Sequence, residues 1–533
     1  MQEQSLHYPY SSTRNVAVAK HGMVATSQPL AADAGLEMLK QGGNAVDAAI
    51  ATAAALTVVE PTSNGIGGDA FAIIRYDGAL YGVNGSGKSP ASLSKSALQG
   101  NGPNAMPRFG VLPITTPGAV KAWGEISERF GSLDFATLLG PAIRHAKEGY
   151  ALSPTLAQSW ARALKAYKTH FTGAVFTPFF ETFAKDNATP MPGDVVYLKD
   201  HARTLQAIAD TKGETMYKGP LAQTIAEFIQ AHGGYLSTDD LANHSTQWVE
   251  PLYMNYKGVN VYELPPNGQG MIALSSLGML QGDEIGDDPQ SLHLQIEALK
   301  RAFSDGTAYI GDPQKMNTDH SELLKESYLL SRRRSITAHA QIPKHGTPSA
   351  SGTVYLSTAD AQGNAVSFIQ SNYMGFGSGV VIPGTGIAMQ NRGHGFSMTP
   401  GHPNEVAGNK RPYHTIIPGY LEKPGEYEGP FGVMGGFMQP QGHLQVISSL
   451  VDNGLNPQSA LDKPRWHWVK DTHVQVEQAM PSATVQALMR RGHKVEVLGD
   501  PSVFGRGQII LRLKSGVLIG GTEKRTDGAI SLH

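Results

Sequence analysis

The sequence predicts an α+β sandwich, in which β-sheets are packed between layers of helices. Residues 29–59 show two helical patterns, and two pairs of short strands, at residues 70–83 and 353–371, have the spacing of β-hairpins. Further helices and strands alternate as far as residue 520. Helices and strands that share one chain in this way are typical of sheets whose outer faces are covered by helices.

The first expected elements are two helices. Residues 29–41 (PLAADAGLEMLKQ) have helical spacing, and the Gly-Gly pair that follows stops this helix. Asn44 is placed to cap a second helix that extends to about Val59. This second segment holds the most apolar run of the chain, which is too short to span a membrane and suits a buried helix.

A glycine-rich turn at residues 64–69 leads into the first hairpin, whose two arms are joined by Asp77-Gly78. Residues 115–245 have mainly helical patterns that are interrupted by Gly and Pro turns. The elements expected in this half are strands at Ala70–Tyr76, Ala79–Val83 and within 251–265, and helices at Ala119–Phe130, Leu205–Ala209 and Ser291–Asp305.

Residues 336–351 differ from both neighbouring segments, because they carry His, Lys, Pro, Ser and Gly with almost no apolar periodicity. This composition predicts an exposed linker. The second hairpin, at 353–360 and 365–371, follows it. The remaining expected elements are an apolar stretch at 378–390, strands near 430–437 and at 494–498, 507–513 and 516–520, and helices at about 441–453 and 482–491.

Composition excludes several classes of function. The 533 residues include 43 Lys and Arg against 45 Asp and Glu, so no basic patch is expected and nucleic acid is not an expected partner. The chain has no cysteine, which excludes disulfides, thiolate metal sites and a cysteine nucleophile. The N-terminal segment is polar and has no apolar core of the kind found in signal peptides. We therefore expect a cytoplasmic protein that does not partner a membrane.

The second hairpin begins on a threonine, Thr353, that follows Gly352. A threonine at a new N-terminus can act as a nucleophile, because its own α-amino group is a base within reach of the hydroxyl. Gly352 would give the backbone the freedom that attack on its carbonyl requires. A Gly-Thr pair also opens many ordinary strands, so this tract alone leaves both interpretations open.

A second candidate feature is the pair Gly435-Gly436, which ends an apolar strand just before a helix. Two unobstructed backbone N–H groups at such a place could stabilise a developing oxyanion. A strand-to-helix turn that needs positive φ explains the same glycines without any catalysis.

Three further patterns do not favour a separate functional site. Gly82–Ser89 fits the phosphate-loop pattern G-x-x-x-x-G-K-S, but it follows a hairpin arm and precedes no clear helix, so a glycine-rich turn over a substrate pocket is preferred to a nucleotide site. No histidine pair has zinc-ligand spacing, and neither a metal nor another cofactor is expected. His394, His402 and His414 lie in Gly- and Pro-rich segments, where histidines are mostly solvated.

Motifs along nearly the whole chain resemble the gamma-glutamyltransferase (glutathione hydrolase) family of N-terminal-nucleophile hydrolases. They include Gly22–Ser27, Gly42–Ala49, Glu60-Pro61, Gly65–Gly68, Thr116–Gly118, Pro265-Pro266, Glu297–Lys300, Gly311–Pro313, Asp360–Val366, Phe376–Gly379, Pro383–Gly386, Lys410–Pro412 and Gly435-Gly436.

The resemblance implies an αββα sandwich made from one precursor that cleaves itself between Gly352 and Thr353. It implies a large subunit of residues 1–352, mostly helical, and a small subunit of residues 353–533, which stay together as partners. Thr353 would be the nucleophile, Ser371 a hydroxyl that supports it, and Gly435-Gly436 the oxyanion hole. Whether this heterodimer forms a larger homo-oligomer is left open.

The departures from the family pattern concern the substrate pocket. Ser86 stands where family members hold the substrate's α-carboxylate with arginine, and Tyr373 stands in place of an asparagine near the nucleophile. His414-Thr415 replaces a serine pair, and the segment around Arg392 lacks the acid that holds an α-amino group. The short stretch at 398–409 predicts that the family's lid over the pocket is missing.

A pocket with Arg392 and His414 but no acid predicts a small amide whose acyl group carries a carboxylate and no amine. This resembles the branch with glutaryl-cephalosporin acylases and small-amide amidohydrolases. Hydrolysis or transfer of γ-glutamyl groups, a nucleotide-binding protein that uses Gly82–Ser89, and a processed but inactive binding protein stay as alternatives. A surface or inter-subunit ion pair would equally explain Arg392.

Overall fold

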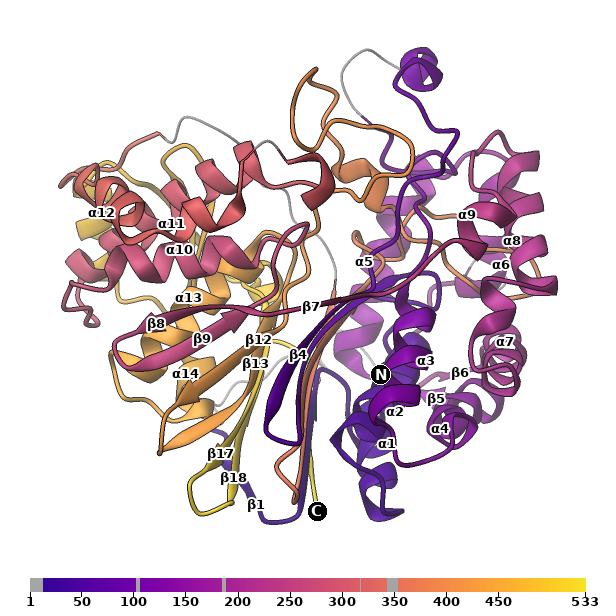
Figure 1. Ribbon diagram of the computed structural model, residues 1–533, viewed down its shortest axis with the longest axis horizontal. Helices are drawn as coiled ribbons and strands as arrows, with labels where there is room; N and C mark the ends of the chain where they lie inside the picture. The colour runs from indigo at the N-terminus through magenta and orange to yellow at the C-terminus, as the bar shows by residue number, and fades with distance from the viewer. Residues whose placement is uncertain (1–12, 102–105, 185–187, 317, 343–352) are drawn as a thin grey trace.

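The computed structural model describes residues 13–101, 106–184, 188–316, 318–342 and 353–533. Two seven-stranded sheets lie face to face in the middle of the molecule, and helices cover the outer face of each sheet (Figure 1). The predicted αββα sandwich is therefore confirmed. Within these residues, no helix is both long enough and apolar enough to cross a membrane.

All neighbouring strands of the two large sheets are antiparallel. Sheet I contains, in spatial order, β1 (Ala17–Ala19), β18 (Leu518–Thr522), β17 (Arg506–Leu513), β13 (Tyr427–Met434), β12 (Gly419–Lys423), β9 (Val259–Glu263) and β8 (Leu252–Tyr256). Sheet II contains β19 (Ala529–Leu532), β2 (Gly22–Thr26), β10 (Val354–Asp360), β11 (Ala365–Ser371), β3 (Asp69–Tyr76), β4 (Ala79–Asn84) and β7 (Gln247–Val249).

The helices form two groups, one beside each sheet (Figure 1). The group beside sheet II consists of α1 (Pro29–Lys40), α2 (Ala45–Val59), α3 (Ala119–Phe130), α4 (Phe135–Glu148), α5 (Pro154–His170), α6 (Thr177–Phe183), α7 (Lys199–Asp210), α8 (Pro220–Ala231) and α9 (Thr238–Ala242). The group beside sheet I consists of α10 (Gly270–Leu280), α11 (Pro289–Tyr309), α12 (Glu326–Arg334), α13 (Met438–Val451), α14 (Pro457–Asp462) and α15 (Ser482–Arg490). Two small sheets complete the fold, β14 (Trp466–Lys470) with β15 (His473–Glu477) and β16 (Lys494–Leu498), and β5 (Tyr150–Ala151) with β6 (Val195–Val196).

The apolar core has a layer on each side of the sheets and a thinner layer between them. Helix α2 is buried along its whole length, which agrees with the expected buried helix. Its start is fixed by Asn44, whose side chain accepts hydrogen bonds from the N–H groups of Val46 and Asp47. A cap of this kind satisfies N–H groups that the helix itself leaves without partners.

Most predicted elements are present with small shifts at their ends. The apolar stretch at 378–390 forms only isolated bridges, α13 begins at Met438, three residues before its approximate predicted start, and α7 begins at Lys199, six residues before the predicted Leu205. The strands that were not predicted are β1, β2, β5, β6, β7, β12, β14, β15 and β19.

The predicted linker is described only as far as residue 342, and the rest of it lies outside the described residues. Residues 336–342 form no helix or strand, as predicted. They are nevertheless held in place, because the Ala340 N–H donates to the carbonyl oxygen of Arg491 at 2.7 Å and the Gln341 carbonyl accepts from Lys300 Nζ.

The predicted cleavage after residue 352 would leave each large sheet with strands from both subunits. Strands β1, β8 and β9 of sheet I precede this point and its other strands follow it. Sheet II is divided in the same way, because β2, β3, β4 and β7 precede the point and β10, β11 and β19 follow it. The two predicted subunits therefore share both sheets, while the division itself stays a prediction.

Candidate active site

Thr353 lies directly before β10, in the middle of sheet II, and its side chain is fully buried. Val354 pairs with Gln370 across β10 and β11, so the next position along brings Thr353 beside Ser371. The Thr353 hydroxyl donates a hydrogen bond to Ser371 Oγ at 3.2 Å. Two predicted site residues are thus brought together. Gly352 lies outside the described residues.

Strand periodicity places both hydroxyls on the inner face of sheet II. Alternate side chains of a strand point to the same face. Tyr355, two residues after Thr353, and Ile369, two residues before Ser371, belong to the apolar layer between the sheets. Thr353 and Ser371 therefore face the space between the two sheets, at the ends of their strands.

A carboxyl group that was not predicted as part of the site lies next to these two hydroxyls. Asp69 is the first residue of β3 and pairs with Ser371 across β11 and β3. Phe71, two residues later, also lies in the apolar layer between the sheets. Thr353, Ser371 and Asp69 thus occupy neighbouring positions on three adjacent strands, with their side chains on one face.

Asp69 also corrects two expectations about the pocket. Its Oδ2 lies 3.1 Å from His414 Nε2, and both side chains are fully buried. The predicted pocket without an acid is therefore wrong. His414 is not solvated but packs on the Phe71 ring, with centroids 4.6 Å apart.

The other two histidines of this region are also engaged. His394 Nδ1 lies 2.8 Å from the carbonyl oxygen of Met106, and His402 Nε2 lies 3.0 Å from that of Thr307. The expectation of solvation is therefore wrong for the fully buried His414, whereas His394 and His402 are partly exposed and each also contacts a backbone carbonyl. No described contact joins His394 or His402 to Thr353.

Arg392 is a buried cation and not a surface residue, with only 1% of it exposed. Its Nη1 donates to Thr415 Oγ1 at 2.7 Å, and its guanidinium carbon lies 4.7 Å from the centre of the Tyr373 ring. In the described part of the chain, Nε and Nη2 of Arg392 have no hydrogen-bond partner, and no acid lies within salt-bridge distance. Arg392 therefore forms no direct ion pair within the described residues, although the charge of Asp69 acts on it at longer range.

Tyr373 joins this arginine to the hydroxyl pair. Its backbone N–H donates to Ser371 Oγ at 2.8 Å, while its ring lies against Arg392. The backbone of Tyr373 has a φ of 76°, which is uncommon for a residue other than glycine. Residues held in such conformations concentrate at functional sites.

The glycine pair is connected to Thr415 through Gln269, a residue that the sequence analysis missed. Gln269 Nε2 donates to the carbonyl oxygens of Thr415, at 2.6 Å, and of Gly436, at 2.8 Å. Gly435 and Gly436 have φ values of 133° and 60°, so both need the freedom of glycine. Helix α13 begins two residues later, which directs its first N–H groups toward this turn.

One continuous series of contacts therefore links most of the predicted site. It runs from Thr353 through Ser371, Tyr373, Arg392, Thr415 and Gln269 to Gly436. Asp69 and His414 lie beside it, because Asp69 neighbours Ser371 and His414 precedes Thr415.

Ser86 lies just after β4, and its hydroxyl is already hydrogen-bonded within the protein. Its Oγ donates to Asn84 Oδ1 at 2.7 Å, and its carbonyl oxygen accepts from Arg411 Nε at 3.0 Å. The segment Gly82–Ser89 lacks the context of a phosphate loop, because β4 is the second arm of an antiparallel hairpin and no helix begins at residues 85–90. The nucleotide-site alternative therefore has no structural support, and the preferred glycine-rich turn over a substrate pocket stays a prediction.

Burial controls the ionisation of the three titratable side chains Asp69, His414 and Arg392. It raises the pKa of Asp69 to about 7, although Arg392 and the N–H groups of Gly118 and Gly87 oppose the shift. Burial and the nearby charge of Arg392 together hold the pKa of His414 well below its usual range. Burial lowers the pKa of Arg392 to about 10, so this side chain stays charged at neutral pH.

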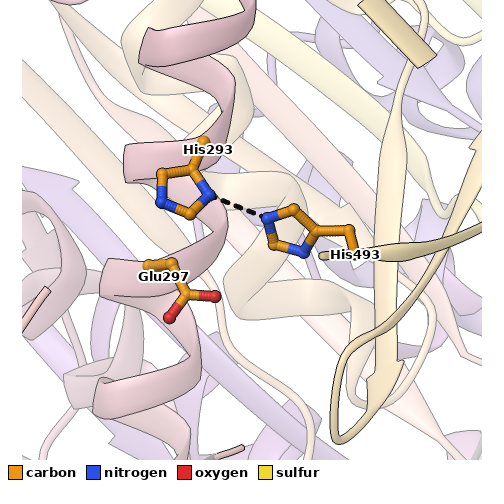
Figure 2. A group of neighbouring side chains, drawn as sticks. All are labelled: His293, Glu297 and His493. Atoms are coloured by element: carbon orange, nitrogen blue, oxygen red, sulfur yellow. Dashed lines mark hydrogen bonds between the residues drawn. The ribbon is translucent and has the colours of Figure 1, made fainter. Parts of the chain in front are cut away.

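A second cluster of ionisable groups lies away from this site (Figure 2). His293 and Glu297 of α11 and His493, just before β16, bring ligand atoms within 4.8 Å of one another. His293 Nδ1 lies 2.8 Å from His493 Nε2. The Glu297 carboxylate accepts from Lys300 at 2.6 Å and from Arg301 at 2.9 Å. Because its two oxygens already bind cations, we interpret the cluster as a structural network and not as a metal centre.

Comparisons with known proteins agree with this geometry. A family model described as gamma-glutamyltranspeptidase matches residues 31–533. The glutathione hydrolase-like YwrD proenzyme of Bacillus subtilis is 34% identical over 521 residues, which is 95% of this chain and 97% of that protein. The oxamate amidohydrolase proenzyme of Klebsiella pneumoniae is 34% identical over 528 residues, or 96% and 98% of the two chains.

A solved structure matches the entire sandwich. The crystal structure of cephalosporin acylase from Bacillus halodurans superposes with a TM-score of 0.97, at 53% identity, and covers 100% of this chain and 99% of that one. The αββα sandwich is thus of the N-terminal-nucleophile hydrolase type.

Proposed function

The chain belongs to the gamma-glutamyltranspeptidase family, and from that premise we propose that it is a self-processing amidase whose nucleophile is Thr353. The observation that carries the proposal is the hydrogen bond between the buried hydroxyls of Thr353 and Ser371, at the strand ends between the two sheets. The curated relatives named above are proenzymes, which supports a processed chain.

Processing begins with attack of the Thr353 hydroxyl on the carbonyl carbon of Gly352. The C–N bond of that peptide breaks, an ester forms, and the nitrogen becomes the free α-amine of Thr353. Water then hydrolyses the ester and leaves residues 1–352 and 353–533 as two subunits. Because both sheets contain strands from each part, the two subunits stay associated.

Turnover uses the same hydroxyl. The freed amine accepts the proton of the Thr353 hydroxyl as its oxygen attacks the amide carbonyl of the substrate. The N–H groups of Gly435 and Gly436 stabilise the oxyanion of the tetrahedral intermediate. The amine returns the proton to the leaving nitrogen, and water hydrolyses the acyl-threonine. Ser371 orients the nucleophile through its hydrogen bond.

We propose that the acyl group carries a terminal carboxylate, which binds Arg392. Two N–H groups of this buried guanidinium are unpaired in the described part of the chain, and a carboxylate can accept from both. Tyr373 and Thr415 hold the guanidinium in place. A glutaryl amide or another half-amide of a dicarboxylic acid has this chemistry.

A γ-glutamyl compound is the second candidate, because Asp69 is an acid near Arg392. However, Asp69 Oδ1 accepts from the Gly118 N–H at 3.1 Å, and Oδ2 faces His414. Its oxygens are therefore occupied within the protein, which favours an acyl group without an ammonium.

The two candidates are separated by comparing glutaryl and γ-glutamyl 4-nitroanilides on the purified protein. We expect a kcat/KM at least about tenfold higher for the glutaryl compound, because the γ-glutamyl compound must also bury an ammonium that finds no free acceptor. A higher value for the γ-glutamyl compound would contradict the assignment of the pocket. Thr353→Ala should abolish hydrolysis of both compounds, whereas Thr353→Ser, which keeps a hydroxyl, should retain part of it.

A further inference from the structure

We infer that binding of a substrate carboxylate to Arg392 is coupled to the uptake of one proton by the Asp69–His414 pair. The inference rests on the proposed function, because it uses the carboxylate site at Arg392. It assigns to Asp69 a role in substrate selection that depends on pH. Asp69 is a positioning residue in this account and does not touch the scissile amide.

First, Arg392 and the Asp69–His414 pair share one buried region. Arg392 Nη1 binds the Thr415 hydroxyl at 2.7 Å, and Thr415 directly follows His414. His414 Nε2 lies 3.1 Å from Asp69 Oδ2. All four side chains are at least 99% buried. Charges in such a region interact more strongly than they would in water.

The second step is the balance of charge around the pair. The ionisable groups that interact electrostatically with Asp69 are His414, Arg392 and Arg411. The charge of Asp69 also affects Tyr217. His414 also faces Arg392. Asp69 is the one acid that these interactions bring to Arg392 in the described residues. An ionised Asp69 therefore offsets the charge of Arg392 in the empty site.

The third step follows when a substrate carboxylate arrives. A second anion beside Arg392 competes with ionised Asp69 for the same guanidinium, and two like charges in one buried region disfavour each other. Burial already raises the pKa of Asp69 to about 7, so the proton that removes this repulsion is available near neutral pH. Binding of the carboxylate raises the proton affinity of the pair further, by linkage.

The sign of the pH effect follows from this linkage. Below pH 7 Asp69 is largely protonated before the substrate binds, and the carboxylate meets no repulsion. Above pH 7 each binding event must also take a proton from solution. The preference for a carboxylate-bearing acyl group should then fall by up to about tenfold for each pH unit.

The experiment compares glutaryl 4-nitroanilide with pentanoyl 4-nitroanilide, which has a methyl group in place of the carboxyl group. The ratio of the two kcat/KM values removes the pH dependence that both substrates share through the Thr353 amine. We expect this ratio to be constant below about pH 7 and to decrease above it. In Asp69→Asn the ratio should be independent of pH, and it should exceed the wild-type ratio at pH 9.

Calorimetry on the wild-type protein keeps the test valid if Asp69→Asn fails to fold. Binding of 5-oxohexanoate, a methyl ketone that keeps the terminal carboxylate, and of 2-hexanone, which has a methyl group in its place, is measured at pH 8 in two buffers with different ionisation enthalpies. 5-Oxohexanoate should take up about one proton more than 2-hexanone. Equal proton uptake, or a ratio of kcat/KM values that does not change with pH, would overturn the inference. Hydrolysis of neither anilide would instead refute the proposed function.

Discussion

At the scale of single residues, the site depends on a few buried polar side chains whose partners are specific. Ser371 Oγ accepts hydrogen bonds from the Thr353 hydroxyl and from the Tyr373 N–H. One hydroxyl therefore orients both the proposed nucleophile and the residue whose ring packs on Arg392. Arg392 keeps its charge in a buried position although two of its N–H groups lack partners in the described residues. Such an arrangement costs stability, and a substrate anion would offset that cost.

Arg392→Met tests this arrangement at the residue scale. The change removes the charge but keeps an unbranched side chain beside Tyr373. We expect the KM for glutaryl 4-nitroanilide to rise by about 10- to 100-fold, which corresponds to about 1.4–2.8 kcal/mol of lost charge-assisted binding. The KM for pentanoyl 4-nitroanilide serves as the control and should change little. An equal rise for both substrates would mean that Arg392 acts only on the shape of the pocket.

Ser371→Ala removes the hydroxyl that accepts from Thr353. We expect kcat to fall by about 10- to 1,000-fold, because the nucleophile loses the group that orients it. Ser371→Thr keeps a hydroxyl and should retain most of the activity. If Ser371→Ala were as active as the wild-type protein, the hydrogen bond at 3.2 Å would have no role in the reaction.

At the scale of elements, the strand ends decide which side chains meet. Strands β10, β11 and β3 are adjacent, and their register places Thr353, Ser371 and Asp69 in one row. Opposite them, the turn between β13 and α13 carries the glycine pair. The catalytic proposal therefore needs both the register of sheet II and the left-handed backbone of this turn.

Gly436→Ala tests the turn at the element scale. Gly436 has a φ of 60°, where an alanine side chain strains the backbone by about 1 kcal/mol. We expect kcat to fall by at least about tenfold, because a shift of this turn misplaces the N–H groups that we propose stabilise the oxyanion. Gly454→Ala is the matched control, since Gly454 has a φ of 63° and open space around its Cα. The control should lose a similar amount of stability and keep its kcat.

How much of the fold follows from the sequence also depends on the type of element. Helix α2 was predicted to its last residue, because Asn44 and the apolar run mark its ends. Strand β2 was missed, since its five residues are buried on both faces and show no alternation. The C-terminal strand β19 was missed because only its pairing with β2 identifies it. Local patterns predict capped helices and hairpins, while strands defined by distant partners need the tertiary structure.

The candidate site shows the same limit. Motifs identified Thr353, Ser371, Arg392 and the glycine pair, and the structure joins them in one series of contacts. Asp69 was assigned to a glycine-rich turn, and nothing in the local sequence shows that it neighbours Ser371. Only the register between β3 and β11 brings the acid into the pocket.

At the scale of the whole molecule, the free energy of unfolding should depend strongly on pH in the acid range. His201, His467 and His493 are buried, and burial lowers the pKa of each to about 4. Unfolding exposes them and restores a pKa of about 6.5, so the unfolded chain binds more protons between pH 6.5 and 4. Glu60 and Asp69 act in the opposite direction, because burial raises the pKa of each carboxyl to about 7.

The expected net effect is a loss of stability as the pH falls from 6.5 towards 4. Each histidine contributes up to about 1.4 kcal/mol for each pH unit, and each raised carboxyl offsets a similar amount. Urea unfolding at several pH values measures the slope. His467→Gln should reduce it by up to about 1.4 kcal/mol for each pH unit. A variant with an unchanged slope would show that His467 keeps the same pKa in the folded and unfolded chain.

The central claim is that catalysis needs the Thr353 hydroxyl and the amine that its own cleavage releases. The most direct test is intact mass spectrometry of freshly purified protein during incubation, with hydrolysis of glutaryl 4-nitroanilide followed in the same samples. We expect two chains that result from cleavage between residues 352 and 353, and activity that increases in proportion to the cleaved fraction. Full activity in protein whose chain is entirely uncut would contradict it.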